Sequence, residues 1–213
     1  PSLSVMIVTG AGGNFCSGAD LKAVAKGERR AIRDSGIAPM GPTRLQLSKP
    51  VIAAVEGYAV AGGLELALWC DLRVAAENAV FGVYCRRFGV PLIDLGTIRL
   101  PRLIGHGRAM DLILTGRSVD AQEALSFGLV NRIVENGKAL ETAFELAKTI
   151  AAFPQTCLRG DRMSTIEQWD LDVESAINRE FQYGMETMGS GETKEGAHSF
   201  AQGLGKHGKS LQD

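Results

Sequence analysis

This sequence of 213 residues has almost no excess of charge of either sign. Its 23 Lys and Arg residues nearly balance 24 Asp and Glu residues, which gives a formal net charge of −1 at pH 7, and no long basic block is present. Because binding to nucleic acid or to anionic membranes depends on positive charge, neither partner is expected. Uninterrupted apolar runs of membrane length are also missing, so no membrane-spanning helix is predicted.

Cysteine and histidine are scarce as well. The four cysteines are scattered without CxxC spacing: Cys16, Cys70, Cys85 and Cys157. Cys70 and Cys157 lie in apolar or helical contexts, which is typical of reduced cysteines and favours a cytoplasmic protein. The three histidines have no metal-ligand spacing: His106, His198 and His207. The sequence therefore predicts no metal site.

One stretch, residues 49–71 (KPVIAAVEGYAVAGGLELALWCD), organises the rest of the chain. Its segment 51–55 is short, apolar and rich in β-branched residues, which is typical of a strand buried on both faces. Glycines then interrupt the chain, and residues 64–70 are apolar and favour a helix. The stretch therefore predicts a strand, a glycine turn and a buried helix.

Glu65 is unusual because it is a lone carboxylate in the first turn of that apolar helix. Burial of an unpaired charge costs several kcal/mol or more. The helix dipole or a distant arginine could stabilise it in a purely structural role, or it could carry chemistry. Gly62 and Gly63 leave the same two interpretations open: they allow tight packing of helix on strand, or they leave backbone N–H groups free to bind an anion or oxyanion.

The stretch KPVIAAVEGYAVAGGLELALWCDLRVA resembles the central segment of the crotonase (enoyl-CoA hydratase/isomerase) superfamily, and the upstream GAGGNFCSGADL resembles that family's other signature. The resemblance implies an α/β fold: a crotonase-like βαβ superhelical spiral core with a C-terminal helical portion. We expect the core in residues 1–137, with its N-terminal part apparently missing, and a helical trimerisation region in residues 138–213. Assembly as a homotrimer or homohexamer is implied.

The resemblance also implies the chemistry. An acyl-CoA thioester would bind with its carbonyl oxygen between the backbone N–H groups of Ala19 and Gly62, and Glu65 would act as the acid/base. CoA belongs to the substrate, so no cofactor is expected. Ser17, Asp20 and Leu21 lie in the loop around Ala19 and are predicted to contact substrate. The local alternative is a turn in which Asp20 caps a helix. A dinucleotide-binding GxGxxG pattern fails because Phe15 occupies the position of its last glycine.

One position departs from the family pattern. In hydratases of the family, a second catalytic carboxylate stands four residues after the Phe that corresponds to Phe81, and here that position is Cys85. A thiol, with an ordinary pKa of about 8.5, substitutes poorly for a carboxyl that exchanges protons with water. Asp94 lies where double-bond isomerases of the family have an acidic proton carrier. It also precedes a predicted helix at residues 97–104, so it could be a simple N-cap.

The expected activity is that of an enoyl-CoA hydratase-like enzyme acting on the double bond of an enoyl-CoA through a stabilised enolate. The alternatives are an enoyl-CoA isomerase, or a weakly active or non-catalytic acyl-CoA-binding homologue, because of Cys85. A serine hydrolase is disfavoured because no GxSxG elbow is present.

The remaining segments are predicted to be scaffold. Residues 23–42 mix charge, Gly and Pro and are expected to form a mobile helix and loop, followed by a short helix over 43–48. Helical patterns continue to residue 203. Along 171–188 one helical face carries residues of a core or a subunit contact: Val173, Ile177, Phe181, Met185 and Met188. A small basic tail follows: Lys206, His207 and Lys209.

Overall fold

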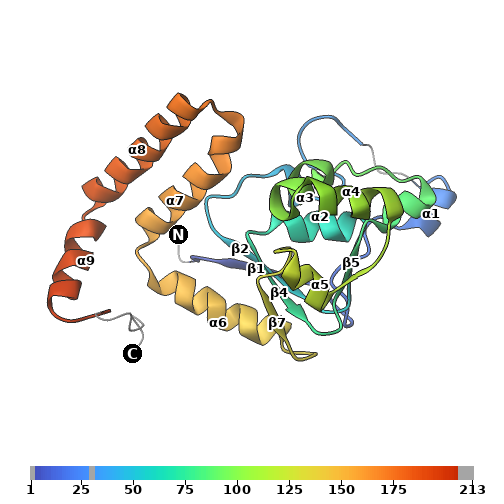
Figure 1. The fold of residues 1–213 in the computed structure, drawn as a ribbon, viewed down its shortest axis with the longest axis horizontal. Coiled ribbons are helices and arrows are strands. Elements are labelled where there is room, and N and C mark those ends of the chain that lie inside the picture. The colour runs from blue at the N-terminus through green and yellow to red at the C-terminus, as the bar shows by residue number, and fades with distance from the viewer. Residues whose placement is uncertain (1–2, 29–31, 206–213) are drawn as a thin grey trace. The chain divides into compact units, whose positions relative to one another are not determined.

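A computed structural model of the chain describes residues 3–28 and 32–205 (Figure 1). The chain divides into two compact units. The larger comprises Met6–Leu47 and Val51–Ala147, and the smaller comprises the described parts of 1–5, 48–50 and 148–213. The larger unit ends inside a helix, whereas the predicted domain boundary at residue 137 falls before that helix. The predicted basic tail lies outside the described residues.

The larger unit contains two small sheets. The first has the strand order β1-β2-β4-β7, with every neighbouring pair parallel: β1 (Met6–Thr9), β2 (Val51–Val55), β4 (Leu72–Ala76) and β7 (Arg132–Val134). In the second, β5 pairs in parallel with one neighbour and antiparallel with the other: β3 (Tyr58–Val60), β5 (Val80–Gly82) and β6 (Val119–Asp120). All five residues of β2 are buried, which confirms the predicted two-sided burial.

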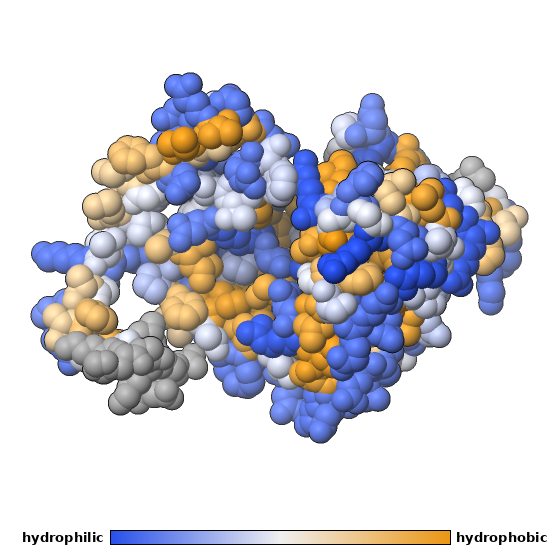
Figure 2. Space-filling model, in the orientation of Figure 1, coloured by the Kyte–Doolittle hydropathy of each residue, from blue (hydrophilic) through white to orange (hydrophobic). Residues whose placement is uncertain are grey.

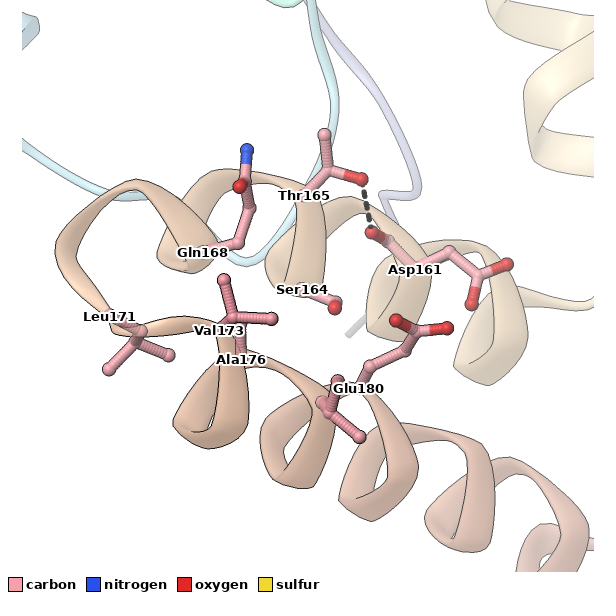
Figure 3. A pocket seen from close by; sticks show the side chains of 9 residues that line it. Asp161, Ser164, Thr165, Gln168, Leu171, Val173, Ala176 and Glu180 are labelled. Atoms are coloured by element: carbon pink, nitrogen blue, oxygen red, sulfur yellow. Dashed lines mark hydrogen bonds between the residues drawn. The ribbon is translucent and has the colours of Figure 1, made fainter.

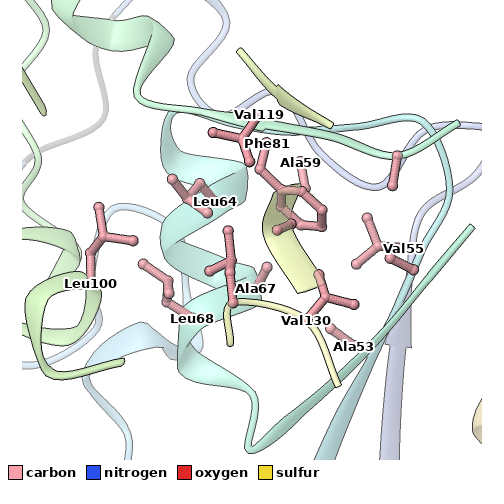
Figure 4. Packing of buried hydrophobic residues seen from close by; sticks show 14 of the residues in the cluster. Ala53, Val55, Ala59, Leu64, Ala67, Leu68, Phe81, Leu100, Val119 and Val130 are labelled. Carbon is pink, nitrogen blue, oxygen red and sulfur yellow. The ribbon is translucent and has the colours of Figure 1, made fainter. Parts of the chain in front are cut away.

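Six helices and two 3₁₀ turns of the described residues belong wholly or in part to this unit: α1 (Leu21–Ala25), η1 (Pro42–Arg44), α2 (Gly62–Trp69), η2 (Tyr84–Phe88), α3 (Gly96–Ile104), α4 (His106–Thr115), α5 (Ala121–Ser126) and α6 (Ala139–Ala152). Leu64, Ala67 and Leu68 of α2 pack with Phe81 of β5 and Leu100 of α3 in one apolar cluster (Figure 4). The cluster holds the first turn of α2, and therefore Glu65, against the start of α3.

Two predicted local structures differ from what forms. The short helix expected over 43–48 is wrong, because only the single turn η1 forms and Leu45 is already extended (φ −79°, ψ 139°). The carbonyl oxygen of Leu45 accepts a 2.8 Å bond from the indole Nε1 of Trp69, which ties the segment to α2 instead. Of the described residues in 23–42, only 23–25 at the end of α1 and Pro42 at the start of η1 are helical.

Arg73 on β4 is almost completely buried. Its guanidinium donates to four backbone carbonyl oxygens: Leu129 (2.6 Å), Cys70 (2.6 Å), Ala67 (3.2 Å) and Asp71 (3.2 Å). Ala67 and Cys70 lie in the last turn and at the end of α2, where carbonyl groups lack helical partners and attract a cation. The charge is thereby solvated by the backbone and links α2 to the segment before β7.

The smaller unit is helical, with α7 (Gln155–Glu167), the turn η3 (Gln168–Asp170), α8 (Val173–Ser190) and α9 (Glu192–Ala201). Asp172 caps α8 by accepting from the Ser175 N–H (2.9 Å). The carboxylate of Glu192 accepts from the N–H groups of Thr156 and Cys157 (both 2.9 Å), so α9 caps the start of α7. In the described part of the chain, no helix is both long and apolar enough to cross a bilayer.

The apolar face predicted on α8 forms but is not part of a core within the chain. Its five side chains are between 48% and 77% exposed, and we call them the α8 stripe: Val173, Ile177, Phe181, Met185 and Met188. In Figure 2, apolar residues follow the course of α8 at the upper left. Of the two interpretations given by the sequence, the core is therefore wrong for this helix, and a subunit contact stays a prediction.

Candidate active site

Glu65 is buried, with only 3% of its surface exposed. Its Oε1 accepts two backbone hydrogen bonds, from the N–H of Asp94 and from the N–H of Gly96, both 2.9 Å long. Gly96 is the first residue of α3, so the carboxylate sits at the N-terminus of that helix and not only of its own. Burial raises the pKa of Glu65 to about 7, against the lowering effect of these two amides. A carboxyl group with this pKa exchanges protons readily near neutral pH.

Asp94 is equally buried, at 3%. Its Oδ1 accepts from the backbone N–H of Met40 (2.9 Å) and from the hydroxyl of Thr43 (2.5 Å). The structural interpretation of Asp94 as a helix N-cap is wrong: α3 is preceded by Leu95, and no side chain caps it. Leu95 takes a left-handed conformation (φ 68°), which turns the chain between Asp94 and the helix. The carboxylate of Asp94 therefore binds Met40 and Thr43 and not the first N–H groups of α3. The N–H of Asp94 meanwhile binds Glu65, which brings both predicted acid–base residues together.

Cys85 is buried in η2, close enough to Glu65 to interact with its charge. Burial raises the pKa of its thiol, and the nearby Glu65 raises that pKa further. The thiol is therefore neutral at physiological pH and cannot replace a charged carboxylate. The neighbouring arginines point elsewhere: Arg86 donates to the carbonyl of Ile113 (3.1 Å), and Arg87 donates twice to the carbonyl of Gly116 (3.0 and 2.6 Å).

The glycine turn before α2 packs very closely against the loop that contains Ala19. A Cβ atom added to Gly63 would lie 1.9 Å from the carbonyl oxygen of Cys16, and one added to Gly18 would lie 2.7 Å from the backbone nitrogen of Gly62. The packing interpretation of the glycines is thus correct for Gly63. Gly62 is also closely packed, because a Cβ there would lie 2.8 Å from Sδ of Met40. Its N–H nevertheless has no acceptor among residues 3–28 and 32–205, and the same is true of the N–H of Ala19.

The peptide that carries the Gly62 N–H is held in an unusual orientation. Ala61 has φ 54° and ψ −126°, and only it and Leu95 have positive φ among the described non-glycine residues. Such conformations cost about 1–3 kcal/mol and concentrate at functional sites. Here one flanks Gly62 and the other stands between Asp94 and Gly96, so both strained residues adjoin the candidate site.

The loop residues predicted to contact substrate lie on the surface. Asp20 accepts from the N–H groups of Lys22 (2.9 Å) and Ala23 (3.2 Å), which confirms its interpretation as the N-cap of α1. Ser17 and Leu21 are exposed on either side of Ala19. This placement leaves the loop accessible to a ligand, and the substrate contacts themselves stay a prediction.

Three residues of the site carry no local signal in the sequence. Met40 and Thr43 donate to Asp94, and Arg99 donates to the carbonyl oxygens of Thr43 (2.8 Å) and Asp94 (3.4 Å). A threonine after Gly-Pro is typical of a turn, and the partner that gives it a role lies 51 positions away. Within the described ranges, no group of three His, Cys, Asp or Glu residues could hold a metal ion.

The smaller unit has a groove of its own, of about 560 Å³, between α7, η3 and α8 (Figure 3). Asp161 and Glu180 contribute carboxylates to it, and Val173 and Ile177 of the α8 stripe line it as well. None of the predicted site residues lies there. The groove is therefore an extension of the exposed stripe.

The site combines a buried carboxyl group of pKa about 7 with a second buried carboxylate, that of Asp94, whose backbone N–H donates to the first. The N–H groups of Gly62 and Ala19 have no acceptor within the described residues. These features are typical of a class of protein: enzymes that move protons next to a carbonyl group.

Comparison with known proteins makes the class specific. The family model for enoyl-CoA hydratase/isomerase matches residues 1–207. The enoyl-CoA hydratase EchA19 of Mycobacterium tuberculosis is 37% identical over 210 residues, which cover 95% of this chain and 78% of that protein. The carnitinyl-CoA dehydratase of Salmonella typhi is 44% identical over 155 residues, 70% of this chain and 58% of that protein. The crystal structure of the enoyl-CoA hydratase EchA1 from Mycobacterium marinum covers 94% of this chain and 78% of its own, with a TM-score of 0.85 and 39% identity.

The chain therefore belongs to the enoyl-CoA hydratase/isomerase family, and it is a hydratase-like acyl-CoA enzyme of the crotonase superfamily. The predicted fold class is thereby confirmed.

Proposed function

We propose that the protein acts on the double bond of an enoyl-CoA thioester through an enolate, with Glu65 as the principal acid/base. The observation that carries this proposal is the pKa of about 7 that burial gives Glu65, beside a second buried carboxylate. The N–H groups of Ala19 and Gly62 would donate to the thioester oxygen, where negative charge develops when a proton leaves the α carbon. One such donor is typically worth roughly 3 kcal/mol in the transition state.

Two reactions of an enoyl-CoA need these groups in different ways. In hydration, one carboxylate takes a proton from water as its oxygen bonds to the β carbon, and a carboxyl group gives a proton to the α carbon. In isomerisation, a carboxylate removes a proton from the α carbon of a 3-enoyl thioester, and a carboxyl group returns one to the γ carbon. Isomerisation needs no activated water, so Glu65 with Asp94 suits it better than hydration, for which Cys85 is a poor partner.

The remaining assignments follow from the same reasoning. CoA would enter as part of the substrate, and no other cofactor is required. Ser17, Asp20 and Leu21 would contact the substrate beside Ala19, with Cys85 on the opposite side near Glu65. The exposed α8 stripe supports assembly as a homotrimer or homohexamer, and the scattered free cysteines support a cytoplasmic location.

The decisive experiment compares crotonyl-CoA hydration with 3-hexenoyl-CoA isomerisation in wild type, Cys85→Glu and Cys85→Gln. The wild type should isomerise faster than it hydrates. Cys85→Glu should gain hydratase turnover, because Arg86 and Arg87 are held by carbonyl groups of α4 and the following turn. Cys85→Gln controls for the larger side chain without a carboxyl group.

Fast hydration by the wild type, with no gain in Cys85→Glu, would mean that another residue supplies the second proton. A protein that CoA stabilises against heat but that turns over neither thioester would be an acyl-CoA-binding homologue and not an enzyme.

A further inference from the structure

The two carboxylates of the site are held in the same way, each through one oxygen. Both backbone donors to Glu65 bind Oε1, and both donors to Asp94 bind Oδ1. No donor in residues 3–28 or 32–205 contacts Oε2 of Glu65 or Oδ2 of Asp94. Each group therefore has one oxygen committed to the protein and one available to exchange a proton.

The anchoring differs in one respect. Glu65 is held by two backbone N–H groups, which no side-chain substitution removes, whereas one of the two donors to Asp94 is the side chain of Thr43. The 2.5 Å distance between the Thr43 hydroxyl and Oδ1 is in the range of strong charge-assisted O–H···O⁻ bonds. Thr43 has no exposed surface, so water does not compete for this bond.

The segment around Thr43 is itself fixed on both sides. The Nη2 of Arg99 on α3 donates to the carbonyl oxygen of Thr43 (2.8 Å), and the indole of Trp69 on α2 donates to the carbonyl oxygen of Leu45, two residues further along the chain (2.8 Å). The hydroxyl is thus placed by the same two helices that place Glu65 and Asp94. A buried threonine that only filled space would need no such alignment with a carboxylate 51 positions away.

We infer that Thr43 is a positioning residue, whose hydroxyl holds Oδ1 of Asp94 so that Oδ2 faces the reacting carbons. A carboxylate bound by one donor rotates about its Cβ–Cγ bond, and its two oxygens then exchange places. The second donor prevents that rotation. The inference rests on the proposed role of Asp94 in proton transfer.

The test uses Thr43→Val, which keeps the shape of the side chain and removes the hydroxyl, and Thr43→Ser, which restores the hydroxyl. With 3-hexenoyl-CoA as the probe, Thr43→Val should lower kcat by about 10- to 100-fold, the order expected for a displaced catalytic group. KM should change little, because ground-state binding is unaffected, and Thr43→Ser should recover most of the rate. Thr187→Val, which removes a buried hydroxyl from α8, is the matched control and should have full activity.

The same substitution in an Asp94→Asn background separates positioning from stability. Thr43→Val should cost no further activity there, because the group that it positions has already lost its function. An equal loss in both backgrounds, or full activity of Thr43→Val while Asp94→Asn is impaired, would overturn the positioning role alone.

Full activity of Asp94→Asn would instead overturn the proposed role of Asp94, and with it this inference. If Thr43→Val does not fold, Thr43→Ala makes the same comparison with less volume in the core.

Discussion

Helix α2 buries nearly every side chain that it carries, whereas helix α8 leaves a row of its largest apolar side chains exposed. On α2 the unusual residue is therefore a charged one, Glu65, and on α8 the unusual feature is the apolar α8 stripe. On α2 the burial of a charged group is energetically costly, and on α8 the burial of the apolar side chains is incomplete. We therefore expect each helix to meet a molecule outside the chain: a reacting thioester at α2 and, as proposed above, a neighbouring subunit at α8.

The difference also separates two kinds of experiment. A change at the start of α2 should affect turnover while assembly stays the same. A change on the α8 stripe should affect assembly first.

The largest effect is expected at the first residue of α2. Gly62→Pro removes the proposed oxyanion donor and also crowds Met40, so turnover of any enoyl-CoA should fall by more than the roughly 10²–10³-fold typical of one lost donor. Gly62→Ala is the control for crowding: its Cβ would meet Met40 Sδ at 2.8 Å, at a flexible end that can move. A folded Gly62→Pro enzyme with near-normal kcat would exclude this N–H from the oxyanion hole.

The next largest effect on turnover is expected for Glu65→Gln. The amide keeps the size of the side chain and its acceptor oxygen for the Asp94 and Gly96 amides, but it does not exchange protons near neutral pH. General acid–base groups contribute about 10²–10⁴-fold, so kcat/KM should fall by that order, and the inflection of the wild-type pH–rate profile near pH 7 should disappear. Unchanged activity with reduced stability would mean that Glu65 serves only the helix ends.

Glu65 should also make the stability of the folded protein depend on pH. The pKa of Glu65 rises from 4.5 to about 7 on folding, so between these values the folded protein holds a proton that the unfolded chain has released. The free energy of unfolding should therefore fall as the pH rises from about 4.5 to 7, by roughly 3 kcal/mol from this group.

Urea unfolding at several pH values measures this dependence. Glu65→Gln should flatten it and should be more stable than wild type at pH 8. Glu174→Gln, at an exposed position of α8, is the control with the same change of charge. A steep fall that persists in Glu65→Gln would assign the pH dependence to other groups.

The smallest effect on chemistry is expected on α8. Phe181→Glu puts a charge in the middle of the α8 stripe, which should dissociate the proposed trimer in sedimentation equilibrium and leave the fold intact. Gln182→Glu adds the same charge at an exposed position next to it, on another side of the helix, and should not dissociate the assembly. A wild-type chain that sediments as a monomer would remove the need for a covering subunit.

Local patterns predicted the elements that build the site. The apolar run of β2 and the glycine break before α2 lie where the sequence indicated. These signals are local, because burial on two faces demands an unbroken apolar strand and a close backbone approach demands glycine. The family resemblance named Asp94 as a possible second acid–base residue beside Glu65, and the backbone N–H of Asp94 donates to Oε1 of Glu65. The catalytic roles of both residues stay predictions.

The contacts that give each carboxylate its partners could not be predicted in this way. Asp94 precedes a helix and has the local pattern of an N-cap, yet it binds Met40 and Thr43, and Glu65 occupies the start of α3 instead. This arrangement of partners depends on the left-handed conformation of Leu95, which a leucine in the sequence does not predict. Residues more than 25 positions apart decide it, so only the folded structure reveals the arrangement.

The buried guanidinium of Arg73 has a consequence for how the molecule opens. An arginine stays charged, so none of its four carbonyl partners can leave without exposing a cation in an apolar interior. The end of α2, β4 and the turn at Leu129 must therefore lose protection from hydrogen exchange in one cooperative step, close to the free energy of global unfolding. The helix that carries Glu65 is thus clamped at its far end, and local fraying there does not reach its first turn.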